Sequence, residues 1–191
     1  DRYVIAAKID SSTGAITGWA NAYGVGYYLE AHNAIAVSDG IVIAGYKGSS
    51  PMLPMVMKIG FDGSHMWTKV YPCAGQRAAT AVDTGDGIVL ITEGGFGGSE
   101  EYTLLAKLGY DGSRVWEVEH KRSDDDTSSY IYGKSVLLDG DGLVITGNEN
   151  DHTNSKKGLF FARTSLSGLI PDCSLAVESS FDPVAWGITA T

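Results

Sequence analysis

The chain carries one pattern three times: Ser38-Asp39-Gly40-Ile41-Val42-Ile43-Ala44-Gly45, Gly85-Asp86-Gly87-Ile88-Val89-Leu90-Ile91-Thr92 and Gly140-Asp141-Gly142-Leu143-Val144-Ile145-Thr146-Gly147. In each copy an Asp-Gly turn leads into a run of apolar and β-branched residues, which predicts a β-strand that starts at a tight turn. The runs are apolar on both faces, as is typical of a sheet that is covered on both sides. We therefore expect repeated sheets that pack against one another.

A second pattern, an apolar run that ends in a basic residue and is followed by a turn, occurs four times. The basic residues are Lys8, Lys58, Lys107 and Arg163, spaced 50, 49 and 56 residues apart. The turns that follow are Thr13-Gly14, Asp62-Gly63, Asp111-Gly112 and Ser167-Gly168. Three copies continue to a tryptophan, at Trp19, Trp67 and Trp116, and the fourth has Cys173 and Leu175 in that region. Glycine permits the positive φ that tight hairpin turns need.

Each repeat therefore holds four predicted strands: an Ala- or Ser-rich strand A, the Ile/Val strand B, strand C with the basic residue, and strand D with the tryptophan. Four short antiparallel strands in about 40–50 residues form the unit of a β-propeller blade. We predict an all-β fold, a four-bladed β-propeller of four-stranded antiparallel blades in a single domain spanning residues 1–191. Its complete blades occupy about 31–72, 77–120 and 130–179, and its closing blade combines 182–191 with 1–24.

The closing blade is expected to be incomplete. Joining the two ends of the chain leaves 36 residues from Arg163 round to Lys8, which is short by one strand and a turn. The missing piece is strand B, because no Asp-Gly-Ile-Val sequence follows Thr191. Three interpretations stay open: a three-stranded closing blade, a truncated chain, or a neighbouring molecule that fills the gap or covers the exposed edge.

The order of these motifs resembles the extracellular β-propeller repeats of bacteria and archaea called delta-sixty repeats. The resemblance rests on Lys58, Asp62-Gly63, Trp67 and Asp86-Gly87, and again on Lys107, Asp111-Gly112, Trp116 and Asp141-Gly142. It implies a propeller and an extracellular setting, but little about function, because propellers host unrelated activities. A free-standing set of four blades departs from that family. In size and repeat count the chain is also similar to four-bladed propeller proteins that polymerise into extracellular tubes.

Composition excludes several classes of protein. The chain has 14 basic and 23 acidic residues, a net charge of −9, and scattered Lys and Arg, so nucleic acid is not an expected partner. No run of 18 apolar residues is present, so we expect no membrane span. The chain begins Asp1-Arg2 without an initiator methionine, and we expect a secreted protein whose signal peptide has been removed.

No set of residues with a catalytic or zinc-binding spacing is visible. The four histidines, His32, His65, His120 and His152, stand apart from one another, and we expect each to be solvated or hydrogen-bonded. No serine-nucleophile elbow or phosphate-binding loop is present. Two acidic loops are weak candidates for a calcium site, with Asp124, Asp125, Asp126, Glu149 and Asp151 as the ligands; the alternative is a solvated acidic surface.

The repeated residues are expected to have structural roles. Asp39, Asp86 and Asp141 can bond backbone N–H groups at their turns, and the basic residues of the C strands form a second possible ring. Trp19, Trp67 and Trp116 are expected to pack between blades rather than to stack on a sugar. Cys73 and Cys173 fall at the periphery of opposite blades, so we expect them to be free or to bridge different molecules.

These features predict a non-enzymatic, extracellular structural subunit that associates with copies of itself as a filament, tube or scaffold. The alternative is a binding module whose rim loops hold a carbohydrate, a peptide or calcium. No other cofactor is expected.

Overall fold

The regular elements of the computed structural model are β-strands, which confirms the prediction of an all-β fold. The structure describes residues 2–24, 28–48, 52–71, 75–94, 103–120, 129–151, 156–168, 176–178 and 184–185. Across these ranges the strands form four antiparallel sheets, and no helix occurs.

The first half of the chain forms a hairpin and a sheet. The N-terminal hairpin consists of β1 (Val4–Ile9) and β2 (Ile16–Tyr23). The first sheet consists of β3 (Leu29–Val37), β4 (Gly40–Lys47), β5 (Leu53–Ile59) and β6 (His65–Val70), each paired with the next, and β15 (Val184–Ala185) adds a fifth strand beyond β6. Within the described residues, no third strand joins the hairpin.

The second half of the chain forms two more sheets, in which consecutive strands again pair in antiparallel order. The second sheet consists of β7 (Gly75–Asp83), β8 (Ile88–Gly94), β9 (Thr103–Leu108) and β10 (Arg114–His120), with β14 (Ala176–Glu178) beyond β10. The third sheet consists of β11 (Ser129–Asp139), β12 (Gly142–Asp151) and β13 (Lys156–Ser165). The strand order follows the sequence in each unit, because tight turns join antiparallel neighbours.

The turns between C and D strands use glycine in the left-handed region. Gly63, Gly112 and Gly168 have φ of +80°, +75° and +79°. At two of these turns an aspartate accepts hydrogen bonds from the serine two residues later: Asp62 Oδ1 from the Ser64 backbone N–H at 2.9 Å, and Asp111 in the same way. The Asp-Gly pairs of the sequence therefore mark hairpin turns, as their residue types predict.

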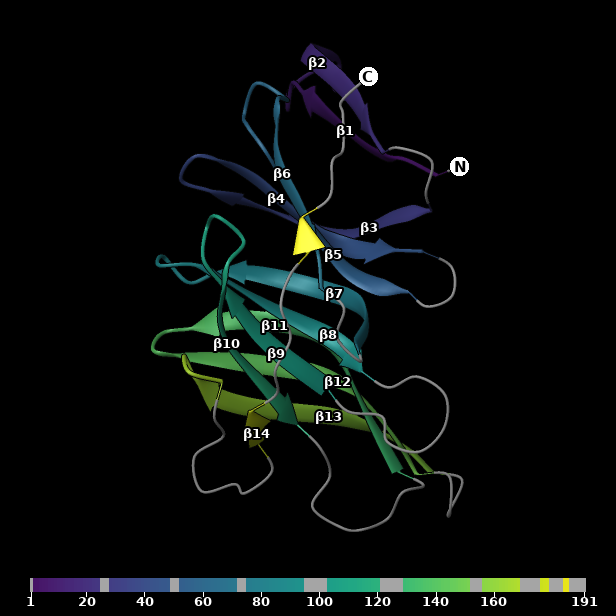
Figure 1. The fold of residues 1–191 in the computed structure, drawn as a ribbon, viewed down its shortest axis with the longest axis vertical. Helices are drawn as coiled ribbons and strands as arrows, with labels where there is room; N and C mark the ends of the chain where they lie inside the picture. The colour runs from purple at the N-terminus through teal and green to yellow at the C-terminus, as the bar shows by residue number, and fades with distance from the viewer. Residues whose placement is uncertain are drawn as a thin grey trace.

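The sheets follow one another along the long axis of the molecule, with the N-terminal hairpin at one end and β13 towards the other (Figure 1). Strand β7 packs against β3 on one side and β11 on the other. A cluster of buried apolar side chains lies between each successive pair of sheets. Pairs that share a cluster are Val4 and Met55, Val56 and Leu104, and Leu105 and Ile145. The core is thus divided into three layers between sheets.

The C-terminal segment lies elsewhere than the sequence predicts. The expected closing blade places 182–191 beside 1–24, but Val184 and Ala185 pair with Val70 and Lys69 of β6. Likewise β14 pairs with β10 of the second sheet, although it was expected in the blade at 130–179. The physical reason is that an edge strand presents a row of unpaired N–H and C=O groups, which an extended segment nearby can satisfy without any repeat pattern.

Candidate functional site

The same contacts join each sheet to the next. Trp19 Nε1 of the hairpin donates a hydrogen bond to Phe61 O in the first sheet, at 3.0 Å. Trp67 Nε1 of the first sheet donates to Tyr110 O in the second, at 3.2 Å. Each indole thus reaches the C–D turn of the following sheet, and this places two of the three repeated tryptophans between units.

The turn glycines leave room for these rings. A Cβ built on Gly63 would lie 2.5 Å from the ring of Trp19, and one on Gly168 would lie 2.7 Å from the ring of Trp116. A buried tyrosine completes the contact, because Tyr23 OH donates to Gly63 O at 2.7 Å. A side chain larger than hydrogen at these turns would therefore displace an indole.

Each of the three sheets contains an ion pair between strand C and the A–B turn. Lys58 Nζ lies 2.7 Å from Asp39 Oδ1, and Lys107 Nζ lies 2.7 Å from Asp86 Oδ1. In the third sheet Arg163 Nη2 lies 2.8 Å from Asp141 Oδ1. Hydrogen bonds from these cations hold the pKa of all three carboxyls below their usual range. The two sets of repeated charges, which the sequence presents separately, are thus partners.

Lys8 of the hairpin is the exception. It occupies the position of Lys58 and Lys107, but no acidic side chain pairs with it in the described part of the chain. In the three sheets that acid comes from the turn between strands A and B, which we call the inner strands. The described hairpin contains only the equivalents of strands C and D. Lys8 therefore marks the place where, among the described residues, the hairpin has no A–B turn.

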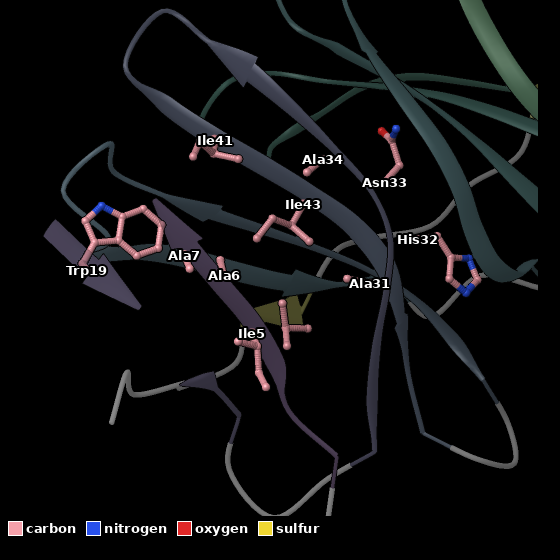
Figure 2. A pocket seen from close by; sticks show the side chains of 11 residues that line it. Ile5, Ala6, Ala7, Trp19, Ala31, His32, Asn33, Ala34, Ile41 and Ile43 are labelled. Atoms are coloured by element: carbon pink, nitrogen blue, oxygen red, sulfur yellow. The ribbon is translucent and has the colours of Figure 1, made fainter. Parts of the chain in front are cut away.

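A groove of about 440 Å³ lies where the inner strands of the hairpin would be expected (Figure 2). One wall is the hairpin, with Val4 and Ala6 of β1 and the Trp19 ring of β2, and the other is formed by β3 and β4, with His32 and Ile43 among the lining residues. In the second sheet the corresponding strands are β7 and β8, and both pack against β11 of the third sheet. The groove is mostly apolar because it exposes positions that are covered in the other units.

A polar cluster lies beside this groove. Glu30 Oε2 accepts a hydrogen bond from Tyr46 OH at 2.7 Å and pairs with Arg2 Nη1 at 3.2 Å. Glu30 Oε1 lies 3.4 Å from His32 Nε2. The hydrogen bond from Tyr46 is the main reason that the pKa of Glu30 is lowered. Because this carboxylate is ionised and already has several partners, it is suited to fixing the edge of the groove rather than to accepting a proton from a substrate.

Strand β10 carries two buried polar side chains, His120 and Glu117, and the sequence patterns gave no signal for Glu117. Within the described residues, Glu117 Oε2 has no hydrogen-bond partner, and His120 is buried beside the Gly168 backbone. Burial raises the pKa of Glu117 to about 7 and lowers that of His120. A hydrogen bond with the Gly168 backbone opposes the lowering of the pKa of His120. His120 stands four residues after Trp116, where Tyr23 stands after Trp19, so it occupies an interface position of the repeat.

The remaining histidines have ordinary surroundings where they are described. His32 lies in β3 beside Glu30. His65 is the first residue of β6, and its Nε2 lies 2.9 Å from Thr68 Oγ1. His152 lies outside the described residues, as do Cys73, Cys173, Asp124, Asp125 and Asp126.

Of the five calcium candidates, only Glu149 and Asp151 fall within the described residues. Glu149 and Asp151 lie in β12, paired with Gly158 and Lys156 of β13, and the structure describes their backbone only. Among the side chains that are described, no group of three or more His, Cys, Asp or Glu residues is arranged to hold a metal ion.

No helix in the described residues is long and apolar enough to cross a membrane. No family model, no curated protein and no solved structure matches the chain.

Proposed function

We propose that this chain is a non-enzymatic structural subunit, an array of propeller-type blades that associates with copies of itself outside the cell. The observation that carries the proposal is that both ends of the array are unfinished. The hairpin leaves the inner edge of β1 unpaired among the described strands, and the third sheet exposes Leu159 and Phe161 on β13. Exposed apolar surfaces and open strand edges are features that association covers.

Three features support a propeller-type arrangement. Each unit runs from an inner strand to an outer strand in sequence order, as propeller blades do. The inner strands β3, β7 and β11 pack on one another in turn. The same tryptophan contact links successive units, and the hairpin supplies the two outer strands of a fourth. The extracellular setting follows from the resemblance of these repeats to extracellular ones.

The chemistry of the described side chains favours a non-enzymatic role. His65 lies within hydrogen-bond distance of the Thr68 hydroxyl, but Thr68 is 2% exposed, so a substrate cannot reach this pair. The Glu30 carboxylate is committed to Tyr46 and Arg2. These groups stabilise strands and edges, and the repeated ion pairs do the same within each unit.

Sedimentation velocity over a hundredfold range of protein concentration tests the proposal. We expect the weight-average mass to rise with concentration, and negative-stain electron microscopy of the concentrated sample to show rings or filaments. A single monomeric species throughout the range would contradict a self-associating structural role.

A second candidate function is the binding of an extended peptide. The unpaired inner edge of β1 borders the apolar groove, and an added strand would satisfy its backbone groups while its side chains fill the groove. Selection from a random peptide library tests this candidate. Enriched peptides that bind the native chain but not Ala6→Asp, which changes a groove residue, would favour it, whereas no enrichment would count against it.

A further inference from the structure

Alternate residues of each C strand face opposite neighbours. In the first sheet, Met55 and Ile59 pack towards the hairpin, in the cluster that contains Val4. Val56 lies between them in sequence and packs towards the second sheet. This follows from the period of two in a β-strand, and it divides every unit into a face for the preceding sheet and a face for the following one.

The hairpin exposes its face for a preceding sheet. Ile9 follows Lys8 as Ile59 follows Lys58, yet Ile9 is 59% exposed and Ile59 is 0% exposed. Ile5 stands three residues before the lysine, as Met55 does, and is 75% exposed against 0%. We call the exposed set of Ile5, Ile9 and Ile16 the hairpin face.

The third sheet exposes its face for a following sheet. Phe161 stands two residues before Arg163, as Val56 stands before Lys58, and is 70% exposed where Val56 is 0% exposed. Leu137 pairs with Val144 as Ile35 pairs with Val42, and it is exposed where Ile35 packs into the core. We call the exposed set of Leu137, Leu159 and Phe161 the β13 face.

These two faces are the two halves of an interface that the chain forms internally between each pair of sheets. The C–D turn of the hairpin supports the same conclusion. No atom lies within 4 Å of a Cβ built on Gly14, whereas the equivalent positions on Gly63, Gly112 and Gly168 meet a tryptophan ring. The hairpin thus has a turn of the kind that receives a preceding sheet, and nothing occupies it in the described structure.

One copy cannot bring its own two faces together in the arrangement observed, because the hairpin and β13 lie towards opposite ends of the long axis (Figure 1). We propose that the β13 face of one copy docks on the hairpin face of a second copy, head to tail. The inference rests on the proposed function and names its contact surface. Because this interface is heterologous, each added copy presents a new free face, and assembly proceeds to a ring or a filament.

Two single substitutions, Phe161→Glu and Ile5→Glu, test the inference. Both positions are exposed, so each variant is expected to fold, which circular dichroism and thermal unfolding would check. A carboxylate in an apolar contact is costly, so each variant alone should weaken association at least about tenfold in sedimentation velocity. The equimolar mixture is expected to form a dimer and stop there, since each variant keeps the face that the other lacks.

Val115→Glu is the matched control. Val115 is an exposed apolar residue, 58% accessible, that belongs to neither face, so this variant should associate as the unmodified chain does. A mixture that stays monomeric, or single variants that associate undiminished, would overturn the head-to-tail contact while leaving self-association intact. An unmodified chain that stays monomeric at all concentrations would overturn both.

Discussion

Strands β1 and β5 have the same pattern of sequence and opposite surroundings. Strand β5 lies between β4 and β6 in a sheet that has neighbours on both sides, and its lysine pairs with Asp39. Strand β1 has the equivalent lysine and apolar residues, but it lies in a two-stranded hairpin at the end of the array. The difference shows that the repeated apolar residues form a surface for contact with another unit. The same positions are covered only where such a unit is present.

The largest expected difference between the two strands is in core packing. Met55→Ala removes a fully buried side chain between the hairpin and the first sheet and should lower the free energy of unfolding by about 3 kcal/mol. Ile5→Ala changes the equivalent exposed position and should cost less than about 0.5 kcal/mol. Urea denaturation of dilute, monomeric protein measures both. Equal losses would show that Ile5 is buried in the monomer.

The turn glycines extend the comparison to the tryptophan contact. Gly63→Ala should cost about 2–4 kcal/mol, because it adds the strain of a positive φ and a clash with the Trp19 ring. Gly14→Ala adds the strain of a positive φ but no clash, so it should lower the free energy of unfolding by about 1 kcal/mol. Thermal unfolding of the two variants isolates the ring contact. If Gly14→Ala costs as much as Gly63→Ala, the turn of the hairpin is occupied after all.

The contribution of Glu117 to the free energy of unfolding should depend on pH. Because its pKa is raised from 4.5 to about 7, the folded state binds a proton that the unfolded state has lost. Its contribution to stability is therefore most favourable below about pH 4.5 and falls as the pH rises towards 7. Glu117→Gln should remove this dependence and stabilise the protein by about 2 kcal/mol at pH 8.

The matched position in the hairpin is Ala20, which follows Trp19 as Glu117 follows Trp116 and is exposed. Ala20→Glu should therefore leave stability unchanged between pH 4.5 and 8. The check is a series of urea denaturation curves at fixed ionic strength. If the difference in stability between Glu117→Gln and the unmodified chain stays constant from pH 4.5 to 8, a buried, neutral Glu117 is contradicted.

Much of the local structure could be predicted from the sequence because it depends on neighbouring residues. The Asp-Gly pairs at Gly63 and Gly112 predict turns with positive φ, and the alternating runs between them predict strands. The tryptophans recur at a fixed distance from those turns, so a contact between units follows from the period. Turns, strands and tryptophan contacts that depend on the residues of one repeat therefore recur in the structure.

The remainder depends on contacts that the repeat does not define. Glu30, Tyr46 and Arg2 come from different segments, and the described residues hold no second copy of their cluster to reveal a pattern. The pairing of β15 with β6 joins Val184 and Ala185 to Val70 and Lys69, and the repeat has no counterpart of this pairing that could predict it. The Lys58–Asp39 pair could have been predicted, since a basic residue and an aspartate recur in every complete unit. The period shows that these charges recur, but it does not show which of them form pairs.

Hydrogen exchange read by mass spectrometry, with the protein dilute and then concentrated, tests the central claim most directly. We expect peptides that cover 4–9 and 156–165 to become protected on concentration, because docking covers the hairpin face and the β13 face together. Peptides that cover 53–59 should not change, since β5 is already buried. Protection that rises with concentration in other segments, with both ends unchanged, would contradict the claim that the ends are halves of one interface.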